Sequence, residues 1–479
     1  MSLLRFTASI NNTITNAFKE NLRVRATGSN SGKSDVLEVF SIYGRESSHS
    51  AELSRVLIQF DTQEIIDRRA QGTLPASGSV SFYLKVFNAE TSRTVPRDFK
   101  MVVKAVSSSW EEGLGLDMEM RTHLDKSNWI SASSTLAWDN EGGDYHTEPV
   151  FEKHFITGLE DLEIDVTSLV EEWVAGTKEN YGFGIHLSSS YEASSSTNPD
   201  GATTSYYTKR FFAKGTQYFF KKPLIEARWN SSRQDDRGNF YLSSALAPAE
   251  DNLNTLYLYN FVRGRLANIP GVGTGSIYVN LYETLGGTAL TQAVETPATG
   301  GWVSTGVYSC SVGVSGDYTT LRDVWFSGST EFHTGTIQVN TLTAQSYGGD
   351  TQYVSKILNL KPIYSNTETP RFYLFTRPRN WQPNIYTVAT TNVSPTIINS
   401  ASFRVYRSID GYVAIPYGVG ADKETLMSYD VSGNYFDLPM EMLEPGYEYT
   451  IKVSFYDDLT STWNEQRESF KFRLGADEY

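Results

Sequence analysis

The stretch VSFYLKV, residues 80–86, decides the fold class. Its apolar residues stand at every second position and alternate with serine, tyrosine and lysine, which is the period of a strand with one buried face. Similar segments recur along the chain, separated by turn residues: VLEVFSIYG from Val36, SRVLIQFD from Ser54 and FKMVVKAV from Phe99. The sequence therefore predicts an all-β protein built from sandwich or barrel sheets.

Composition and charge narrow the class of protein. At about 100–200 residues per domain, the 479 residues suggest three domains. The formal net charge of −14 opposes contact with phosphate backbones, so we expect no nucleic-acid partner. No apolar run approaches the roughly 20 residues that span a bilayer, and we expect no membrane partner. The single cysteine, Cys310, permits no intrachain disulfide.

Polar and turn-rich segments divide the chain into an arm and three sandwiches. We expect residues 1–21 to be an N-terminal arm that orders on a partner, and residues 22–230 to form the first β-sandwich. The run NSSRQDDRGN, residues 230–239, predicts a linker into a second sandwich spanning residues 231–364. The run SNTETP, residues 365–370, predicts a second linker at the start of an immunoglobulin-like sandwich, residues 365–479. The fold class is thus three consecutive β-sandwich domains of jelly-roll or immunoglobulin type.

One segment of the first sandwich departs from the strand pattern. In DVTSLVEEWVAGTKENYG, residues 165–182, the apolar side chains fall on one helical face: Leu169, Val170, Trp173 and Val174. Ser168 with Glu171 three residues later predicts a capping box, and Gly176 predicts the end of the helix. We therefore expect one short helix in the first sandwich.

The sequence LEPGYEY, residues 443–449, resembles the corner of a fibronectin type III domain. In that family a leucine and a proline precede a tyrosine that enters the penultimate strand. The resemblance implies that Tyr449 is the corner tyrosine and that its hydroxyl closes the turn. It covers the C-terminal region alone and supports a fibronectin-like or immunoglobulin-like sandwich there.

A second resemblance covers residues 22–229. The segments GSNSGKSDVLEV, SRVLIQFD, SSSWEEG and DVTSLVEEWVAGTKENYGFGIHL occur in this order before KKPLIEARW. This order resembles the DNRLRE-type domain, a β-sandwich related to carbohydrate-binding modules and common in bacterial surface proteins and large-phage particle proteins. The resemblance implies that most matched positions are fold determinants: Asn30, Gly32, Asp35, Leu37, Val39, Arg55, Phe60, Asp61, Asp165, Val166, Thr167, Val170, Trp173, Gly176, Asn180 and Gly182. Residues 113–146 are an insertion relative to the family.

The run TGSNSGKSD, residues 27–35, superficially resembles a phosphate-binding loop. Only three residues separate Gly28 from Gly32, so the loop is one residue short, and the segment that follows alternates as a strand where the motif needs a helix. We therefore expect a tight turn at Asn30, Ser31 and Gly32, with Lys33 as a surface residue.

Calcium is a minor hypothesis for the loop WDNEGGD, residues 138–144. Its candidate ligands are Asp139, Asn140 and Asp144, because hard cations favour such oxygen clusters. No other cofactor is predicted. The six histidines show no metal-ligand spacing and no nucleophile motif is present, so we expect a protein that is not an enzyme.

Aromatic-rich segments are candidates for contact with a ligand or partner. TSYYTKRFF and RNWQPNIY contain Tyr206, Tyr207, Phe211, Trp381 and Tyr386. Such rings stack on the faces of sugars, and they are also enriched at the centres of protein interfaces. Both interpretations stay open, with the interface preferred.

These observations and the DNRLRE-type resemblance predict a non-enzymatic structural protein of a tailed-phage virion, assembled in the host cytoplasm. It would be an accessory of the neck, tail or baseplate and would hold other virion proteins through its sandwich surfaces, in many symmetric copies. The alternative is a carbohydrate-binding adhesin that recognises host-surface glycans. A glycan-degrading spike ranks third, since neither short-period coils nor paired carboxylates are evident.

Overall fold

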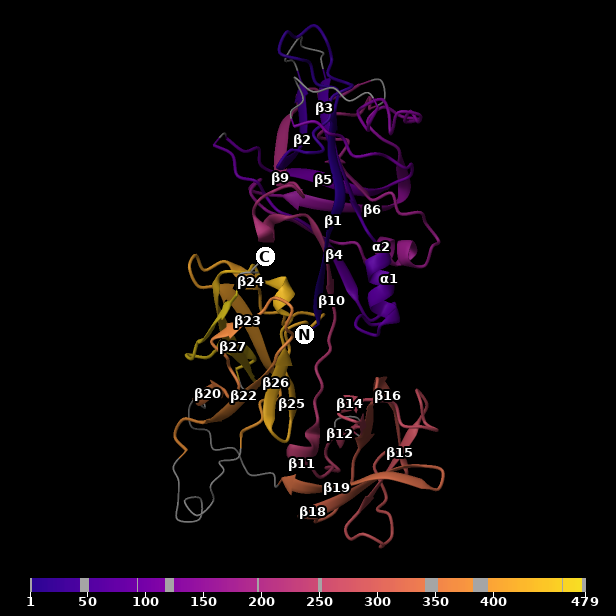
Figure 1. Cartoon of the computed structure of the whole chain (residues 1–479), viewed down its shortest axis with the longest axis vertical. Helices are drawn as coiled ribbons and strands as arrows, with labels where there is room; N and C mark the ends of the chain where they lie inside the picture. The colour runs from indigo at the N-terminus through magenta and orange to yellow at the C-terminus, as the bar shows by residue number, and fades with distance from the viewer. Residues whose placement is uncertain are drawn as a thin grey trace. The chain divides into compact units, whose positions relative to one another are not determined.

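A computed structural model of the chain consists mainly of β-strands, which confirms the all-β class (Figure 1). It describes residues 2–43, 51–92, 94–116, 125–195, 198–248, 252–340, 352–381, 395–458 and 460–475. The chain divides into two compact units. The N-terminal unit comprises residues 3–229, and the C-terminal unit comprises residues 1–2 with 230–479.

The N-terminal unit is a sandwich of ten strands. They follow the order β6-β5-β8-β3-β1-β10-β4-β7, with β2 beside β3 and β9 beside β2. Their bounds are β1 Leu3–Thr15, β2 Val36–Tyr43, β3 Ala51–Phe60, β4 Ser81–Val86, β5 Phe99–Val106, β6 Tyr145–Phe155, β7 Leu162–Asp165, β8 Phe183–Leu187, β9 Tyr206–Phe212 and β10 Leu224–Arg228. The core between the layers contains Val80, Phe82, Leu84 and Val86, so the alternation in the sequence is an alternation between core and solvent.

Strand β1 corrects the expectation of an N-terminal arm at residues 1–21. Residues 3–7 pair with β10, and residues 8–15 pair with β3. The register shifts between Ala8 and Ile10, where the strand passes from one layer to the other. Phe6 and Ile14 are both buried. Most of the expected arm is therefore a central strand of the sandwich (Figure 1).

Two short helices, α1 (Gln63–Ala70) and α2 (Thr167–Val174), lie in the N-terminal unit. The predicted helix is α2, and it buries Leu169, Val170 and Trp173 as expected. The predicted capping box does not form, because Ser168 lies inside the helix and Val166 is the N-cap residue. Glu171 pairs instead with Arg69 of α1 at 2.5 Å, and Asp165 Oδ1 accepts from Thr167 N at the start of the helix. Gly176 follows the helix in the left-handed conformation that stops it. Helix α1 was not predicted.

The insertion at residues 113–146 folds back onto the sandwich where it is described. Its Trp129 and Trp138 form a second apolar cluster with Ile14 of β1 and Leu57 of β3. The Trp138 Nε1 donates a hydrogen bond to the Asn128 carbonyl at 2.8 Å. The insertion therefore covers the outer side of β1 and β3 and leaves the neighbouring pair β2 and β9 uncovered by this cluster.

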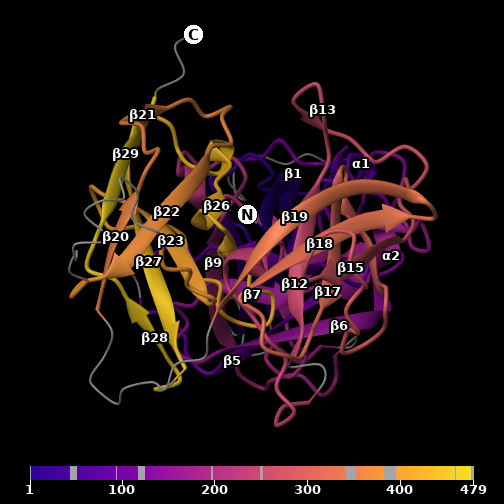
Figure 2. The ribbon, with the colours of Figure 1, turned by 90° about the horizontal axis from the view of Figure 1, so that it is seen from below.

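In the C-terminal unit, a seven-stranded sheet has the order β11-β19-β18-β15-β16-β17-β12 (Figure 2). Its strands are β11 Phe240–Tyr241, β12 Asn254–Tyr259, β15 Ile277–Tyr282, β16 Ala298–Ser304, β17 Val307–Val312, β18 Thr320–Ser327 and β19 Thr330–Asn340. A separate hairpin joins β13 (Phe261–Val262) to β14 (Arg265–Leu266). Trp325 and Cys310 are buried in the core of this sheet.

The remaining strands of this unit form two further sheets, β20-β22-β26-β25 and β21-β29-β27-β23-β24, with β28 beside β27. Their bounds are β20 Tyr353–Ile357, β21 Ile363–Tyr364, β22 Arg371–Pro378, β23 Ala401–Arg407, β24 Val413–Ile415, β25 Ser428–Asp430, β26 Gly433–Asp437, β27 Glu448–Asp457, β28 Thr462–Glu465 and β29 Phe470–Leu474. Because β20 and β21 pair with β22 and β29, these sheets begin before the predicted boundary at residue 365. Tyr449 donates a hydrogen bond from its hydroxyl to the Glu444 carbonyl at 2.9 Å, the turn-closing contact that was predicted for it.

Residues 230–239 are an ordered connection, which corrects the prediction of a linker. Gln234 forms a β-bridge with Tyr429 of β25, and Asp235 N donates to the Tyr429 carbonyl. Asp236 accepts hydrogen bonds from Thr255 N of β12 and from the Tyr429 hydroxyl, both at 2.7 Å. The segment thus holds a strand of the seven-stranded sheet and a strand of the C-terminal sheets at once.

Candidate functional site

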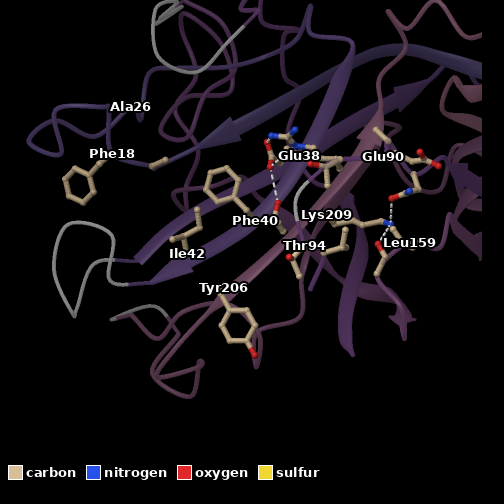
Figure 3. Close-up of a pocket in the computed structure, with 18 of the residues that line it drawn as sticks. Phe18, Ala26, Glu38, Phe40, Ile42, Glu90, Thr94, Leu159, Tyr206 and Lys209 are labelled. Carbon is tan, nitrogen blue, oxygen red and sulfur yellow. Dashed lines mark hydrogen bonds and ion pairs between the residues drawn. The ribbon is translucent and has the colours of Figure 1, made fainter. Parts of the chain in front are cut away.

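An open groove on the N-terminal unit is the best-formed candidate binding site. Its floor is the outward face of β2 and β9. Phe18 and Ala26 lie on one side and Glu90 and Leu159 on the other (Figure 3). The groove has a volume of about 740 Å³, which is within the roughly 300–1,000 Å³ of ordinary ligand sites.

The register of β2 and β9 builds the floor of this groove as three rungs. In an antiparallel pair, residues directly opposite each other lie on the same face. The outward rungs are Ile42 with Tyr206, Phe40 with Thr208, and Glu38 with Arg210. The floor therefore changes from apolar at Ile42 and Tyr206 to ionic at Glu38 and Arg210.

The ionic rung is a closed network. The Arg210 Nε lies 3.1 Å from Glu38 Oε1, and the Thr208 hydroxyl donates to the same oxygen at 3.0 Å. The Glu38 side chain is 26% exposed and that of Arg210 is 44% exposed. Since solvent screens such a pair, it fixes the orientation of the two side chains more than it stabilises the fold.

Lys209 lies behind the floor and is fully used by the fold. Its Nζ donates to Asn88 Oδ1, to the Gly158 carbonyl and to the Glu160 carbonyl at 2.7, 2.8 and 2.7 Å. The ammonium also lies 5.0 Å from the centre of the Phe155 ring. Burial lowers the pKa of Lys209 to about 8, against the opposing effect of nearby carboxylates. Lys209 therefore ties the loops after β4 and β6 to β9.

The five aromatic candidates separate in the structure. Tyr206 lines the groove and is 66% exposed, with its ring stacked on Tyr207 at 5.0 Å. Tyr207 also contacts Phe99, and Phe211 is fully buried in the core. Trp381 belongs to the C-terminal unit and lies beside Arg377, and Tyr386 lies outside the described residues. Tyr206 is thus the aromatic candidate that lines this groove.

The acidic loop at residues 138–144 is closed by its own hydrogen bonds. Asp144 Oδ2 accepts from Asp139 N, and Asp144 Oδ1 accepts from Asn140 N, both at 2.8 Å. Among the residues that the structure describes, no group of three or more His, Cys, Asp or Glu side chains could hold a metal ion. Calcium binding at Asp139, Asn140 and Asp144 stays a prediction, and Asp144 already closes the loop.

The run at residues 27–35 forms a turn against the insertion. Lys33 N donates to the Gly115 carbonyl at 3.0 Å, and Lys33 Nζ pairs with Glu112 at 2.5 Å. A Cβ on Gly32 would lie 2.1 Å from the Gly113 carbonyl oxygen. Glycine is needed here because two backbone segments approach closely.

Other positions matched by the DNRLRE-type motif also act within the fold. Asn180 Nδ2 donates to the Phe60 carbonyl at 2.8 Å, and its Oδ1 accepts from Gly182 N. A Cβ on Gly182 would meet the Ile58 carbonyl oxygen at 2.3 Å. Arg55 is half-buried and donates hydrogen bonds to Glu192 and to the Gly142 carbonyl. These contacts explain the residue types without assigning them to a ligand.

Sequence reasoning found Tyr206 but missed the rest of the groove. Glu38, Phe40 and Ile42 occupy the outward positions of β2, and the alternation around Leu37 and Val39 contained that signal. Their partners on β9 lie about 170 residues further along the chain. No local pattern indicates which two strands pair at that separation.

Within the described residues, no helix is both long and apolar enough to cross a membrane. No protein-family model and no curated protein matches the chain.

Three solved structures are weakly similar. The adhesin InvE of Yersinia pseudotuberculosis is 11% identical with a TM-score of 0.15; the match covers 50% of this chain and 56% of that one. A DUF4785 family protein of Legionella pneumophila is 6% identical with a TM-score of 0.14, over 91% of this chain and 90% of that one. The alpha-2-macroglobulin of Salmonella, reacted with methylamine, is 9% identical with a TM-score of 0.15, over 99% and 34%. Such likenesses define neither a family nor a function for this chain.

Proposed function

We propose that the protein is a non-enzymatic structural and binding protein of a tailed-phage particle, which holds its neighbours through sandwich surfaces. The observation that carries the binding role is the groove over β2 and β9, an open sheet face with an apolar floor and charged edges. The phage setting rests on the sequence resemblance to DNRLRE-type particle proteins. Function in such proteins lies in surfaces rather than in a catalytic cleft.

The state of the buried ionisable groups supports a role without catalysis. Lys209 beside the groove has all three N–H groups bound to oxygens of the fold. In the C-terminal unit, Arg237 forms two 2.7 Å hydrogen bonds with Asp323, which also accepts from Trp325 Nε1. Groups committed in this way hold loops and strands together and are not poised to transfer protons.

Mass spectrometry of purified phage particles tests the proposed setting. After heads and tails are separated, the protein is expected in the tail or neck fraction in a constant copy number per particle. Absence from both fractions would overturn the assignment to the virion.

Carbohydrate binding is the second candidate, and Tyr206 favours it. An exposed ring held flat by stacking on Tyr207, with Thr208 and Arg210 beside it, has the parts of a sugar platform. A glycan array probed with the full chain is expected to show saturable binding that Tyr206→Ala abolishes. Tyr218→Ala is the matched control, because Tyr218 is also exposed and does not line this groove. Absence of binding by the wild-type chain at every glycan would contradict this candidate.

A further inference from the structure

The hairpin β13–β14 of the C-terminal unit exposes an apolar surface. Phe261 is 60% exposed, Val262 is 50% exposed and Leu266 is 37% exposed. Trp302 and Val303 of β16 are each 41% exposed. We call these five residues the hairpin patch. Phe261 and Leu266 are cross-strand partners on one face of the hairpin, and large apolar side chains exposed together are typical of an interaction surface.

The hairpin patch is anchored at its base. Asn260 and Ala267 close the hairpin through Asn260 Nδ2 to the Ala267 carbonyl at 2.7 Å and Ala267 N to the Asn260 carbonyl at 3.1 Å. Asn268 Oδ1 then accepts from Trp302 Nε1 and from Gly306 N. These bonds join the hairpin to the turn between β16 and β17, so that the patch is presented from a fixed base.

Two cations lie at the tip of the hairpin. Arg263 and Gly264 form its two-residue turn with φ of 52° and 78°, the conformation that suits a tight hairpin. Arg265 follows directly, and both arginines are exposed. No ion pair of either side chain occurs in the described part of the chain. Since the whole chain carries a net charge of −14, the tip is a local basic site on an acidic protein.

The groove over β2 and β9 has the complementary chemistry. Phe40, Ile42 and Tyr206 give it an apolar floor. Glu90 is an exposed carboxylate on one wall, and Glu20 is an exposed carboxylate on the lining as well. The same polypeptide therefore carries an apolar projection with two cations on one unit and an apolar hollow bordered by carboxylates on the other.

We propose that the hairpin patch of one copy of this chain docks into the β2–β9 groove of a second copy. Phe261 and Leu266 are cross-strand partners on one face of the hairpin and would cover the apolar floor. Arg263 and Arg265 would meet the carboxylates of the walls, which selects the orientation. This inference rests on the proposed function, and names a second copy of the chain as the partner at the groove.

The two docking surfaces differ, so the contact is heterologous. After a single contact forms, one copy keeps an unused groove and the other keeps an unused hairpin patch. Such head-to-tail association continues until it closes into a ring or extends as a filament.

The test is sedimentation-velocity measurement of the full chain across a concentration series. The wild type is expected to form larger species as its concentration rises. The hairpin variant Phe261→Ser with Arg265→Gln and the groove variant Tyr206→Ser with Glu90→Gln are each expected to weaken association at least about tenfold. Lys356→Glu and Tyr218→Ser are matched controls, because they alter an exposed cation and an exposed aromatic elsewhere and should associate like the wild type. Unchanged melting temperatures show that the variants fold.

Mixing the two variants gives the decisive result. The groove variant keeps an intact hairpin patch and the hairpin variant keeps an intact groove, so an equimolar mixture is expected to form dimers and nothing larger. A wild type that stays monomeric, or whose association neither variant weakens, overturns the proposal. So does a mixture that shows no dimer, as it would if the hairpin docked within its own chain or if a glycan were the occupant. None of these outcomes bears on the mass spectrometry of phage particles, because that experiment measures only whether the protein is present in the particle. Failure of the docking proposal can therefore be distinguished from failure of the proposed function.

Discussion

Glu38 of β2 and Arg210 of β9 stand directly opposite each other, and their side chains meet at 3.1 Å on the floor of the groove. In the register that places these two residues opposite each other, Phe40 and Ile42 come to the same outward face as Tyr206. Because a shift by one residue would turn all of these side chains inward, the groove exists only in this register. The candidate site therefore depends directly on the pairing of β2 with β9.

Replacement of Gly32 by alanine should destabilise the N-terminal unit by about 1–3 kcal/mol. The added Cβ would overlap the Gly113 carbonyl oxygen, which is backbone and cannot rotate away. Urea unfolding of the full chain measures the effect. Gly420→Ala is the control, because no atom lies within 4 Å of a Cβ at that position. Equal stability of the two variants would contradict this prediction, because it would show that the backbone around Gly113 moves away from the added Cβ at little cost.

Replacement of Lys33 by alanine should cost no more than about 1 kcal/mol. The Lys33 side chain is 45% exposed, and its partner Glu112 keeps Lys214 and Asn11 N as further partners after the change. Thermal unfolding measures the stability. Calorimetric titration with ATP and magnesium should give no binding heat for either the wild type or the variant; saturable heat lost only in the variant would restore the phosphate-loop interpretation.

Replacement of Lys209 by methionine should destabilise the N-terminal unit by about 2–4 kcal/mol. The change leaves Asn88 Oδ1 and the carbonyl oxygens of Gly158 and Glu160 without their donor. Lys100→Met is the control, because Lys100 is 48% exposed and pairs only with the exposed Glu152 among the contacts described. Chemical unfolding compares the two, and a loss no greater for Lys209 than for Lys100 would contradict the role assigned to it.

Asp235 should make the stability of the C-terminal unit depend on pH. Burial raises its pKa to about 6, and Arg237 only partly offsets this. The folded state therefore binds a proton more tightly than the unfolded state, whose carboxyl titrates near 3.8. The stabilisation is full below pH 3.8 and is lost as the pH rises through 6. Relative to Asp235→Asn, the wild type should lose unfolding free energy between pH 4 and pH 7; parallel pH profiles of the two proteins would refute the prediction.

The sequence predicts strands well where apolar residues alternate and poorly where the buried residues are polar. β4 was evident from VSFYLKV, whereas β1 contains the buried polar residues Asn11, Asn12 and Thr13. Asn11 Nδ2 donates to the Gly32 carbonyl and Asn12 Nδ2 to the Ser127 carbonyl, so distant segments satisfy them. A strand whose buried polar residues find their hydrogen-bond partners in distant segments therefore looks like a loop in the sequence.

Local sequence also failed to predict helix α1 and the candidate groove. Helix α1 buries only Ile65, so its sequence lacks the apolar face from which a helix could be predicted. Asp144 looked like a metal ligand because of its residue type, but its oxygens accept backbone N–H groups within five residues. The groove needs β2 and β9 together, and their pairing is decided by the whole core. Local chemistry could therefore predict fold class and single residues but not the site that they form.

The junction of β1 with β10 also constrains how this protein is made. Arg5 and Glu226 are hydrogen-bonded partners separated by 221 positions, so the first strand of this unit can complete its pairing only after almost the last segment of the unit has been made. Long-range pairing of this kind slows folding, and until β10 joins, β1 and β4 expose edges that other chains can join. The same adjacency brings the entry and exit of residues 3–229 side by side, which makes this unit a cassette that can be moved as a whole between proteins.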